Sequence, residues 1–229
     1  MPETQSALEK ESVYVVIINY NRWADTVECI ESILKSTYPN FRVVVVDNSS
    51  TDGSPQIIAE KFPQVEILAN EQNLGFPGGV NSGLTYAMKS GAGYFLVINN
   101  DTYIDQIMIA SLVQHASQNI GIIAPVIYYA AHPQTVWSAG GKTNPLTLEM
   151  RHYCQYAVEA IDWREVVEQD FVTGCAFLCP REALEKVGLM DPDYFWYYDD
   201  PDFSIRMRRA GLRILVVPKA RMWHKVAMT

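Results

Sequence analysis

Three apolar runs of this sequence end in polar side chains whose types suit the binding of a cation or an anionic ligand. Tyr94–Ile98 runs into Asn99, Asn100 and Asp101, Val13–Ile18 into Asn19, Tyr20 and Asn21, and Phe41–Val46 into Asp47 and the turn after it. Ligands of open α/β sheets bind beyond the carboxyl ends of the strands, so these residues are candidates for one shared site. Turns that follow strands are also rich in Asn and Asp, which is the structural alternative.

A divalent cation would explain acidic residues at converging strand ends, because their carboxylates repel each other unless a cation lies between them. The carboxylate of Asp101 and neighbouring amide oxygens suit Mg²⁺ or Mn²⁺, which typically bridges the phosphates of a nucleotide. His224 lies just past the last apolar run, Arg213–Val217, and could add a nitrogen ligand that favours Mn²⁺. A structural or surface histidine is the alternative for His224.

Asp199 and Asp200 form a second candidate group, directly after four aromatic residues, 195–198. Burial and mutual repulsion would raise the pKa of one carboxyl, and a helix N-terminus would lower that of the other. Such tuning suits a general base. The alternative is that one of them caps a helix that has Pro201 in its first turn.

Composition limits the class of protein. The 229 residues, 48% of them hydrophobic, are enough for one domain with a sizeable core. An excess of 26 acidic over 18 basic residues argues against binding to nucleic acid or to an anionic membrane surface. The four scattered cysteines are expected to be buried free thiols. Residues 1–12 lack the apolar segment of a signal peptide, and no run approaches the roughly 18 apolar residues of a spanning helix.

Apolar runs alternate with helical patterns along the chain, which predicts βαβ units and a largely parallel sheet. Asp25 with Glu28 suggests a capping box, and Ser54 before Pro55 suggests an N-cap. The glycines of Asn73–Gly83 should precede a helix, either to approach a ligand or only to allow a tight connection. Further expected elements are a helix over 105–117 and strands over 121–127, 171–179 and 213–217. The aromatic segment 128–169 has no clear period and is expected to form a binding region.

Seven motifs occur in an order that resembles a known family. They are Val16–Asn21, Val45–Gly53, Asn73–Phe76 with Gly78, Gly79 and Asn81, Leu96–Thr102, Thr173–Ala176, Tyr198–Phe203 with Arg206, and Trp223–His224. This set resembles the family 2 glycosyltransferases, and most of all their rhamnosyltransferase-like and galactofuranosyltransferase-like members. The resemblance implies the GT-A fold, an α/β fold with a mostly parallel central sheet flanked by helices.

The resemblance also implies a role for each matching residue. Asp200 is the expected catalytic base, and Trp196 and Asp199 are expected near the acceptor. Asp101 and His224 are the expected ligands of Mn²⁺ or Mg²⁺, and Asn99 replaces an acid that is common in the family, which should weaken the metal ion's binding without the diphosphate. The residues expected around the nucleotide sugar are Asn19, Tyr20, Asn21, Asp47, Asn73, Asn81, Asn99 and Asn100.

The implied activity is an inverting transfer of a sugar, with rhamnose favoured, from a dTDP- or UDP-linked donor to a hydroxyl of a glycan or lipid-linked acceptor. Such a reaction belongs to polysaccharide and cell-wall biosynthesis. One alternative is a nucleotidyltransferase that makes the nucleotide sugar, although Asn21-Arg22 offers little of the basic, glycine-rich loop it needs. The other is a catalytically weak carbohydrate-binding protein on the same fold, which Asn99 leaves open.

The expected organisation is a polar N-terminal extension over 1–12 and one domain over 13–229, with the acceptor side at about 128–210. The chain stops five residues after His224, where relatives in the family continue, so we expect a C-terminally truncated chain. We expect a cytoplasmic location, with peripheral association at the inner face of the cell membrane.

Overall fold

The computed structural model describes residues 12–144, 146–147, 149–153 and 165–226. Its helices are α2 (Trp23–Ile33), α3 (Ser54–Lys61), α4 (Gly75–Lys89), α5 (Met108–Val113), α6 (Arg181–Val187) and α7 (Asp199–Arg209). Its strands are β1 (Val13–Asn19), β2 (Phe41–Asp47), β3 (Glu66–Ala69), β4 (Tyr94–Asn99), β5 (Thr102–Ile104), β6 (Ile120–Tyr129), β7 (Val136–Ser138), β8 (Gly141–Thr143), β9 (Met150–His152), β10 (Val167–Gln169), β11 (Ala176–Pro180) and β12 (Arg213–His224).

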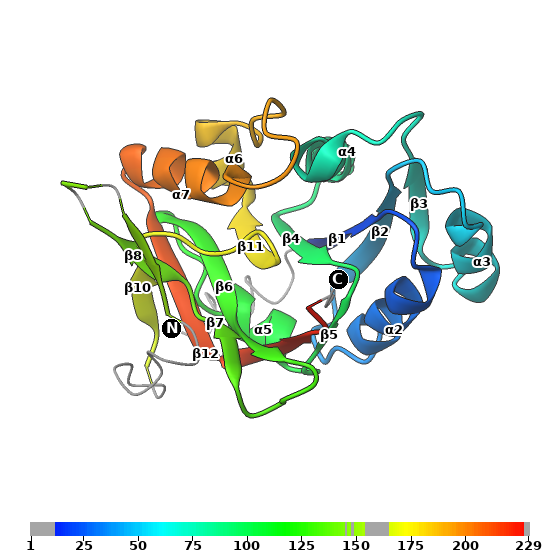
Figure 1. The fold of residues 1–229 in the computed structure, drawn as a ribbon, viewed down its shortest axis with the longest axis horizontal. Coiled ribbons are helices and arrows are strands. Elements are labelled where there is room, and N and C mark those ends of the chain that lie inside the picture. The colour runs from blue at the N-terminus through cyan, green and yellow to red at the C-terminus, as the bar shows by residue number, and fades with distance from the viewer. Residues whose placement is uncertain (1–11, 145, 148, 154–164, 227–229) are drawn as a thin grey trace.

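One large mixed sheet organises the molecule (Figure 1), with strand order β10-β12-β6-β11-β4-β1-β2-β3. Strands β4, β1, β2 and β3 are parallel neighbours, and β12 runs parallel to β6. The β11 strand is antiparallel to both of its neighbours, and β10 is antiparallel to β12. The expected α/β architecture with a mostly parallel sheet is therefore confirmed, with antiparallel strands in the half that follows β4.

Helices cover both faces of this sheet: α4, α6 and α7 lie on one face, and α2, α3 and α5 on the other (Figure 1). The central strands are buried on both faces, which explains why they are continuous apolar runs rather than alternating ones. In β1, for instance, Val15 and Ile17 belong to one core cluster, and Tyr14 and Val16 belong to the other. Each face of the sheet thus has its own hydrophobic core.

Two expected helix starts were wrong. The helix near Asp25 begins at Trp23, after Asn21 and Arg22 in the left-handed conformation, and no side-chain cap is made. Asp25 instead binds Lys225, as does Glu28, so the two do not form a capping box. The next helix begins at Ser54 itself, with Gly53 at φ +80° before it.

The glycines expected before a helix lie inside one, because α4 already begins at Gly75. Glycine is unfavourable in a helix interior, so packing must explain these positions. A Cβ atom at Gly83 would overlap Val16 of β1, and one at Gly79 would lie 2.9 Å from the Asn48 amide nitrogen. The glycines allow α4 to approach the sheet closely.

Other boundaries differ from expectation. The expected helix over 105–117 is short, Met108–Val113, and the strand expected over 171–179 begins at Ala176. The last strand continues to His224, so this histidine lies within β12 rather than after it. The segment 128–169 contains β7, β8, β9 and β10. Its residues 154–164, with Cys154, Tyr156 and Trp163, lie outside the described residues, as do residues 1–11 of the expected extension.

The remaining three cysteines, Cys29, Cys175 and Cys179, are buried free thiols, as expected. In the part of the chain that the structure describes, no helix is both long and apolar enough to cross a membrane.

Candidate active site

The polar strand ends meet at one edge of the sheet. Asn19 at the end of β1 pairs in register with Asp47 at the end of β2, and Ile18 pairs with Asn99 of β4. Asp101 follows immediately and precedes β5, whose antiparallel pairing with β12 places Thr102 opposite His224. The sheet topology therefore brings together the residues singled out by their position after apolar runs.

Asp101 and His224 form the centre of this edge. The Nε2 atom of His224 lies 3.0 Å from Oδ1 of Asp101, and both side chains are largely buried. The indole of Trp137 packs edge-on against the imidazole, with ring centroids 4.6 Å apart. Burial acts to raise the pKa of Asp101, but the hydrogen bond and charge of His224 outweigh it and lower the pKa. Asp101 therefore stays ionised at neutral pH.

The donor set at this edge suits a divalent cation that takes further ligands from a substrate. Two buried polar atoms, Oδ1 of Asn99 and Nδ1 of His224, have no hydrogen-bond partner among the described residues. A carboxylate, an imidazole and an amide oxygen are ligands that Mn²⁺ accepts readily, and Mg²⁺ accepts the oxygens. Within the described ranges, no group of three or more His, Cys, Asp or Glu side chains could hold a metal ion by itself. Asp101 and His224 could hold the ion, with Asn99 close by.

Asp200 lies in the same cavity as this pair. Its Oδ2 accepts a 2.9 Å hydrogen bond from the backbone N–H of Gly174, in the segment that precedes β11. Burial raises the pKa of Asp200 above the ordinary value, against the lowering effect of that hydrogen bond. Burial, followed by repulsion from Asp200, raises the pKa of the neighbouring Asp199 to about 6. Neither residue is the N-cap of α7, because the helix begins at Asp199 after Tyr198, and Tyr198 makes no side-chain cap.

A cavity of about 450 Å³ joins these groups. Its lining includes Asn99, Asp101 and His224 together with Asp199 and Asp200. Its remaining lining residues are Phe76, Trp137, Thr173, Gly174, Cys175, Trp196, Tyr197 and Val226. Six segments distant in sequence therefore contribute to one hollow, which is lined by the carboxylates of Asp101, Asp199 and Asp200.

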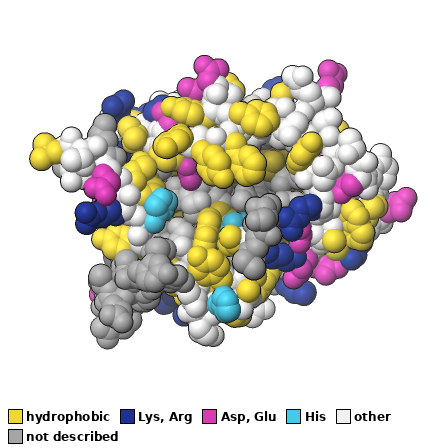
Figure 2. All heavy atoms as spheres, viewed as in Figure 1, with side chains coloured by type: hydrophobic (Ala, Val, Ile, Leu, Met, Phe, Trp, Pro, Cys, Tyr) yellow, Lys and Arg dark blue, Asp and Glu magenta, His cyan; other side chains and the backbone are white. Residues whose placement is uncertain are grey.

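An exposed aromatic segment borders this cavity. Phe195, Trp196, Tyr197 and Tyr198 are between 57% and 73% exposed, which is unusual for four consecutive aromatic residues. Trp196 and Tyr197 stack with ring centroids 5.3 Å apart, and Tyr197 and Tyr198 both have positive φ. Figure 2 shows a band of hydrophobic side chains on the face where the loop between α6 and α7 lies. This segment offers flat apolar surface directly beside Asp200.

Three of the residues predicted around the nucleotide form a buried network. Asn19 is fully buried, and its amide nitrogen donates to Asp47 Oδ1 at 2.7 Å and to Ser50 Oγ at 3.0 Å. The other oxygen of Asp47 accepts from the Ser50 N–H. Asn100 donates to Thr26 Oγ1, which itself donates to Asn19 Oδ1 at 2.6 Å. These side chains are anchored at the edge of the sheet, and their contact with a nucleotide stays a prediction.

The other predicted residues lie around this network. The side chain of Asn21 accepts from the Thr51 N–H, and Tyr20 beside it is 51% exposed. Asn73 accepts from the N–H of Gly75 where α4 begins. The amide of Asn81 binds both the N–H and the carbonyl of Met190, so it anchors the loop that leads to Trp196. Asn81 thus faces this loop from α4 and does not line the cavity.

The sequence analysis missed two buried residues that support the site. The amide of Asn48 donates to the Gly75 carbonyl at 2.8 Å, which ties the end of β2 to the start of α4. Thr26 joins Asn19 to Asn100 from inside α2. Asn48 had a visible signal, since it lies in the polar turn after Asp47. Thr26 had none, because it lies within an ordinary helical pattern.

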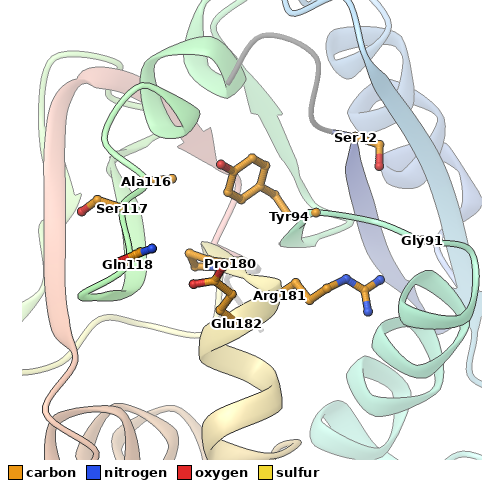
Figure 3. Close-up of a pocket in the computed structure, with 10 residues that line it drawn as sticks. Ser12, Gly91, Tyr94, Ala116, Ser117, Gln118, Pro180, Arg181 and Glu182 are labelled. Carbon is orange, nitrogen blue, oxygen red and sulfur yellow. The ribbon is translucent and has the colours of Figure 1, made fainter. Parts of the chain in front are cut away.

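A larger hollow, of about 580 Å³, lies at the opposite edge of the sheet (Figure 3). It lies among Ser12 before β1, Tyr94 at the start of β4, and Pro180 at the end of β11. Its one guanidinium, that of Arg181, turns toward α4 and donates to the carbonyls of Met88 and Ala92. Arg181 thereby supplies hydrogen-bond donors to carbonyl groups at the C-terminal end of α4. The cluster of acidic residues lies at the other edge of the sheet, in the cavity of Asp101 and Asp200.

The fold itself matches solved glycosyltransferases. A crystal structure of GalNAc-T7 with UDP, GalNAc and Mn²⁺ superposes with a TM-score of 0.72 at 17% identity, covering 93% of this chain. This chain spans 44% of that one, so it corresponds to less than half of it. The architecture is the GT-A fold, as expected from the motifs.

The chain belongs to glycosyl transferase family 2, whose profile matches residues 14–188. Among curated relatives, the N-acetylglucosaminyl-diphospho-decaprenol L-rhamnosyltransferase of Mycobacterium tuberculosis is 27% identical, over 93% of this chain and 76% of its own length. The dTDP-rhamnosyl transferase RfbF of Shigella flexneri is 22% identical, over 94% of this chain and 69% of its own length. The family and its rhamnosyltransferase-like subgroup are thus confirmed.

Proposed function

We propose that this protein is an inverting glycosyltransferase that moves a sugar from a nucleoside-diphosphate donor to an acceptor hydroxyl. The observation that carries the proposal is the placement of Asp200 in the same cavity of about 450 Å³ as the Asp101–His224 pair. A sugar between the two groups would have its leaving phosphate at one side and a base at the other. Such a placement would suit a direct displacement with inversion.

Asp200 acts as the general base in this proposal. Burial raises its pKa, which makes the carboxylate a better proton acceptor than an exposed carboxylate. The Gly174 N–H holds Oδ2, and Oδ1 would accept the proton of the acceptor hydroxyl. The hydroxyl oxygen then forms the new bond to the anomeric carbon as the bond to the diphosphate breaks. The transition state resembles the oxocarbenium-like state of glycoside hydrolysis.

Asp101 and His224 would hold the divalent ion on the donor side, with the amide oxygen of Asn99 in the same cavity. When bound, the ion stabilises the negative charge that develops on the leaving diphosphate. Buried, oriented ligands need little rearrangement when this charge appears. Since the protein supplies few ligands, the diphosphate would complete the coordination.

The acceptor approaches over the exposed aromatic segment. The faces of Trp196 and Tyr197 can pack against the apolar face of a sugar ring, and Asp199 lies between them and Asp200 in the chain. The curated relatives are named for rhamnosyl transfer, one from dTDP-rhamnose and one to a decaprenol-linked N-acetylglucosamine. We therefore favour dTDP-rhamnose as donor and a glycan or lipid-linked glycan as acceptor, which would place the reaction at the cytoplasmic face of a membrane.

The test is a transfer assay with Mn²⁺, dTDP-rhamnose and UDP-sugars as donors, and N-acetylglucosamine linked to a short prenyl diphosphate as acceptor. Asp200→Asn should abolish transfer, whereas its affinity for dTDP stays within about twofold of that of the wild type. Asp193→Asn, the same change at an exposed position before the aromatic segment, is the matched control. Undiminished turnover in Asp200→Asn would exclude Asp200 as the base.

A further inference from the structure

Lys225 connects the strand that carries His224 to helix α2. Its Nζ atom lies 2.6 Å from Oδ1 of Asp25 and 2.5 Å from Oε2 of Glu28. The other oxygen of Asp25 accepts from Nε of Arg22 at 2.7 Å. Arg22, Asp25, Glu28 and Lys225 thus form a network of two cations and two anions at the N-terminal end of α2. Arg22, Asp25 and Glu28 belong to this end of α2 or precede it, whereas Lys225 directly follows β12.

The backbone at the same point is tied to the proposed metal pair. The N–H of Lys225 donates to the carbonyl of Asp101 at 2.9 Å, and the carbonyl of His224 accepts from Ala130. The next residue, Val226, has φ +42° and lines the active-site cavity. A positive φ is strained for a β-branched residue, so it persists only where surrounding contacts impose it. Lys225 is the adjacent residue, and its side chain and backbone are both held.

We propose that Lys225 is a positioning residue, whose ion pairs with Asp25 and Glu28 hold His224 and Asp101 in the geometry that binds the metal–diphosphate complex. Lys225 does not itself touch the reacting atoms. Its ammonium holds the end of β12 against α2, and its N–H fixes the carbonyl of Asp101 beside the carboxylate. The inference rests on the proposed function, since it assigns a further residue to the same site.

The same network links the two sides of the donor site. Arg22 follows Asn21, whose side chain binds the turn after β2 through Thr51. Through the shared Asp25, the ammonium of Lys225 connects this turn to Asp101 and His224. Loss of the ammonium leaves the carboxylates of Asp25 and Glu28 with one cation of this network, Arg22. Repulsion between these carboxylates would then loosen the end of β12.

The first experiment measures binding of Mn²⁺ with dTDP to the full chain by titration calorimetry. Lys225→Met should weaken this binding by about tenfold, as changes behind metal ligands do. At saturating Mn²⁺, kcat should stay within about twofold of the wild-type value, because Asp200 and the aromatic segment are unchanged. Lys61→Met is the matched control. Lys61 of α3 also pairs with an acidic residue of α2, Glu31, but this ion pair is exposed. The control should bind as the wild type does.

The second experiment needs no metal ion. Hydrogen exchange of the Lys225 amide in the metal-free protein should be about tenfold faster in Lys225→Met and unchanged in Lys61→Met. The charge swap Lys225→Glu with Glu28→Lys should recover most of the lost affinity and protection, and Lys225→Arg should keep both. Rescue would show that the ion pair is responsible, even if Lys225→Met folds poorly.

Unchanged affinity and exchange in Lys225→Met would overturn the inference while leaving the proposed function intact. Loss without any rescue by the swap would also overturn it, because the ion pair would then not be the cause. If wild-type protein binds no Mn²⁺ with dTDP or UDP and transfers no sugar, the proposed function fails, and with it the role assigned to Lys225.

Discussion

The imidazole of His224 lies 3.0 Å from the carboxylate of Asp101, although the two residues come from distant parts of the chain. Their contact follows from one antiparallel pairing, in which β5 begins just after Asp101 and β12 ends at His224. The pair offers a cation one oxygen and one nitrogen in a mostly buried setting. If these two side chains are its protein ligands, as proposed, the diphosphate would supply most of the ion's coordination, so binding of the ion and of the nucleotide should be strongly coupled.

The first prediction concerns this coupling. His224→Ala should weaken binding of Mn²⁺ in the presence of dTDP by about 10- to 100-fold, because an inner ligand is lost. Without nucleotide, Mn²⁺ should bind weakly to both proteins. The measurement is calorimetric titration of Mn²⁺ with and without dTDP. His132→Ala, at an exposed position, serves as control. Equal affinities for the His224→Ala and wild-type proteins would contradict the assignment of His224 as a ligand.

The second prediction concerns the pH dependence of transfer. As the proposed base, Asp200 must be ionised to accept a proton, so kcat/KM should fall on the acid side as pH decreases through its pKa. Burial raises this pKa above the ordinary 3.8, so the midpoint of the acid limb should lie above that value. The pH–rate profile at saturating Mn²⁺ measures it. Asp193→Asn should leave the midpoint in place, whereas a midpoint below 3.8 in the wild type would be inconsistent with a buried base.

The third prediction concerns the effect of Asp199 on stability. Burial and repulsion from Asp200 raise the pKa of Asp199 from 3.8 to about 6. A folded-state pKa above the unfolded one means that the folded protein binds the proton more tightly. Ionisation of Asp199 therefore destabilises the folded protein. The full loss of stability is reached above about pH 6, and there is no loss below the pKa of the unfolded state. Asp199→Asn should raise the free energy of unfolding at pH 7.5 by up to about 3 kcal/mol, the equivalent of the shift.

The check is urea unfolding of Asp199→Asn and wild type at pH 7.5 and at pH 4. The difference between the two proteins should shrink toward zero at the lower pH. Asp193→Asn should show no such pH-dependent gain, because Asp193 is exposed. A stabilisation of equal size at both pH values would mean that the effect is not electrostatic.

The strand ends of the site were predictable from the sequence for a physical reason. Strands buried on both faces are continuous apolar runs, so the residue at which each run stops marks the edge of the sheet. Asn19, Asp47 and Asn99 were found in this way, and the register of the parallel strands then aligns them. The order of the seven motifs predicted the GT-A fold in particular. The pattern of strands and helices alone could not distinguish this fold from other α/β folds.

The supporting contacts were not predictable, because their partners lie far apart in the sequence. The amide of Asn81, for instance, binds the backbone of Met190, 109 residues away, and its predicted place near the nucleotide stays a prediction. The start of α4 was missed because glycine is a poor helix former, and close packing on the sheet outweighs that preference. Asp25 and Glu28 have the spacing of a capping box, yet both bind Lys225 from the other end of the chain.

The fourth prediction concerns the acceptor. Trp196→Ala should raise the KM for the acceptor by about tenfold and leave the affinity for Mn²⁺ with dTDP unchanged, because the indole is 70% exposed and belongs to the proposed acceptor surface. The melting temperature should change little for the same reason. Ile107→Ala, at an exposed apolar position just before α5, is the control. An unchanged acceptor KM would place the acceptor elsewhere.

The last prediction concerns the packing of α4 on the sheet. A Cβ atom at Gly83 would overlap Val16 and lie 2.9 Å from Val46, both in strands that lead to the site. Alanine favours a helix by up to about 1 kcal/mol over glycine. The overlap with two buried strands should outweigh this gain, so Gly83→Ala should lower the free energy of unfolding by about 1–3 kcal/mol. Lys89→Ala, exposed on the same helix, should be close to neutral.

A double-mutant cycle separates this overlap from any other effect of the methyl group. Val16→Ala removes the side chain that the new Cβ would meet, at the cost of a small cavity in the wild-type background. If close approach is the reason for Gly83, the double variant should lose less stability than the sum of the two single changes. Urea unfolding of the four proteins measures the coupling. Strictly additive losses would show that Gly83 is required for a reason other than the contact between α4 and β1.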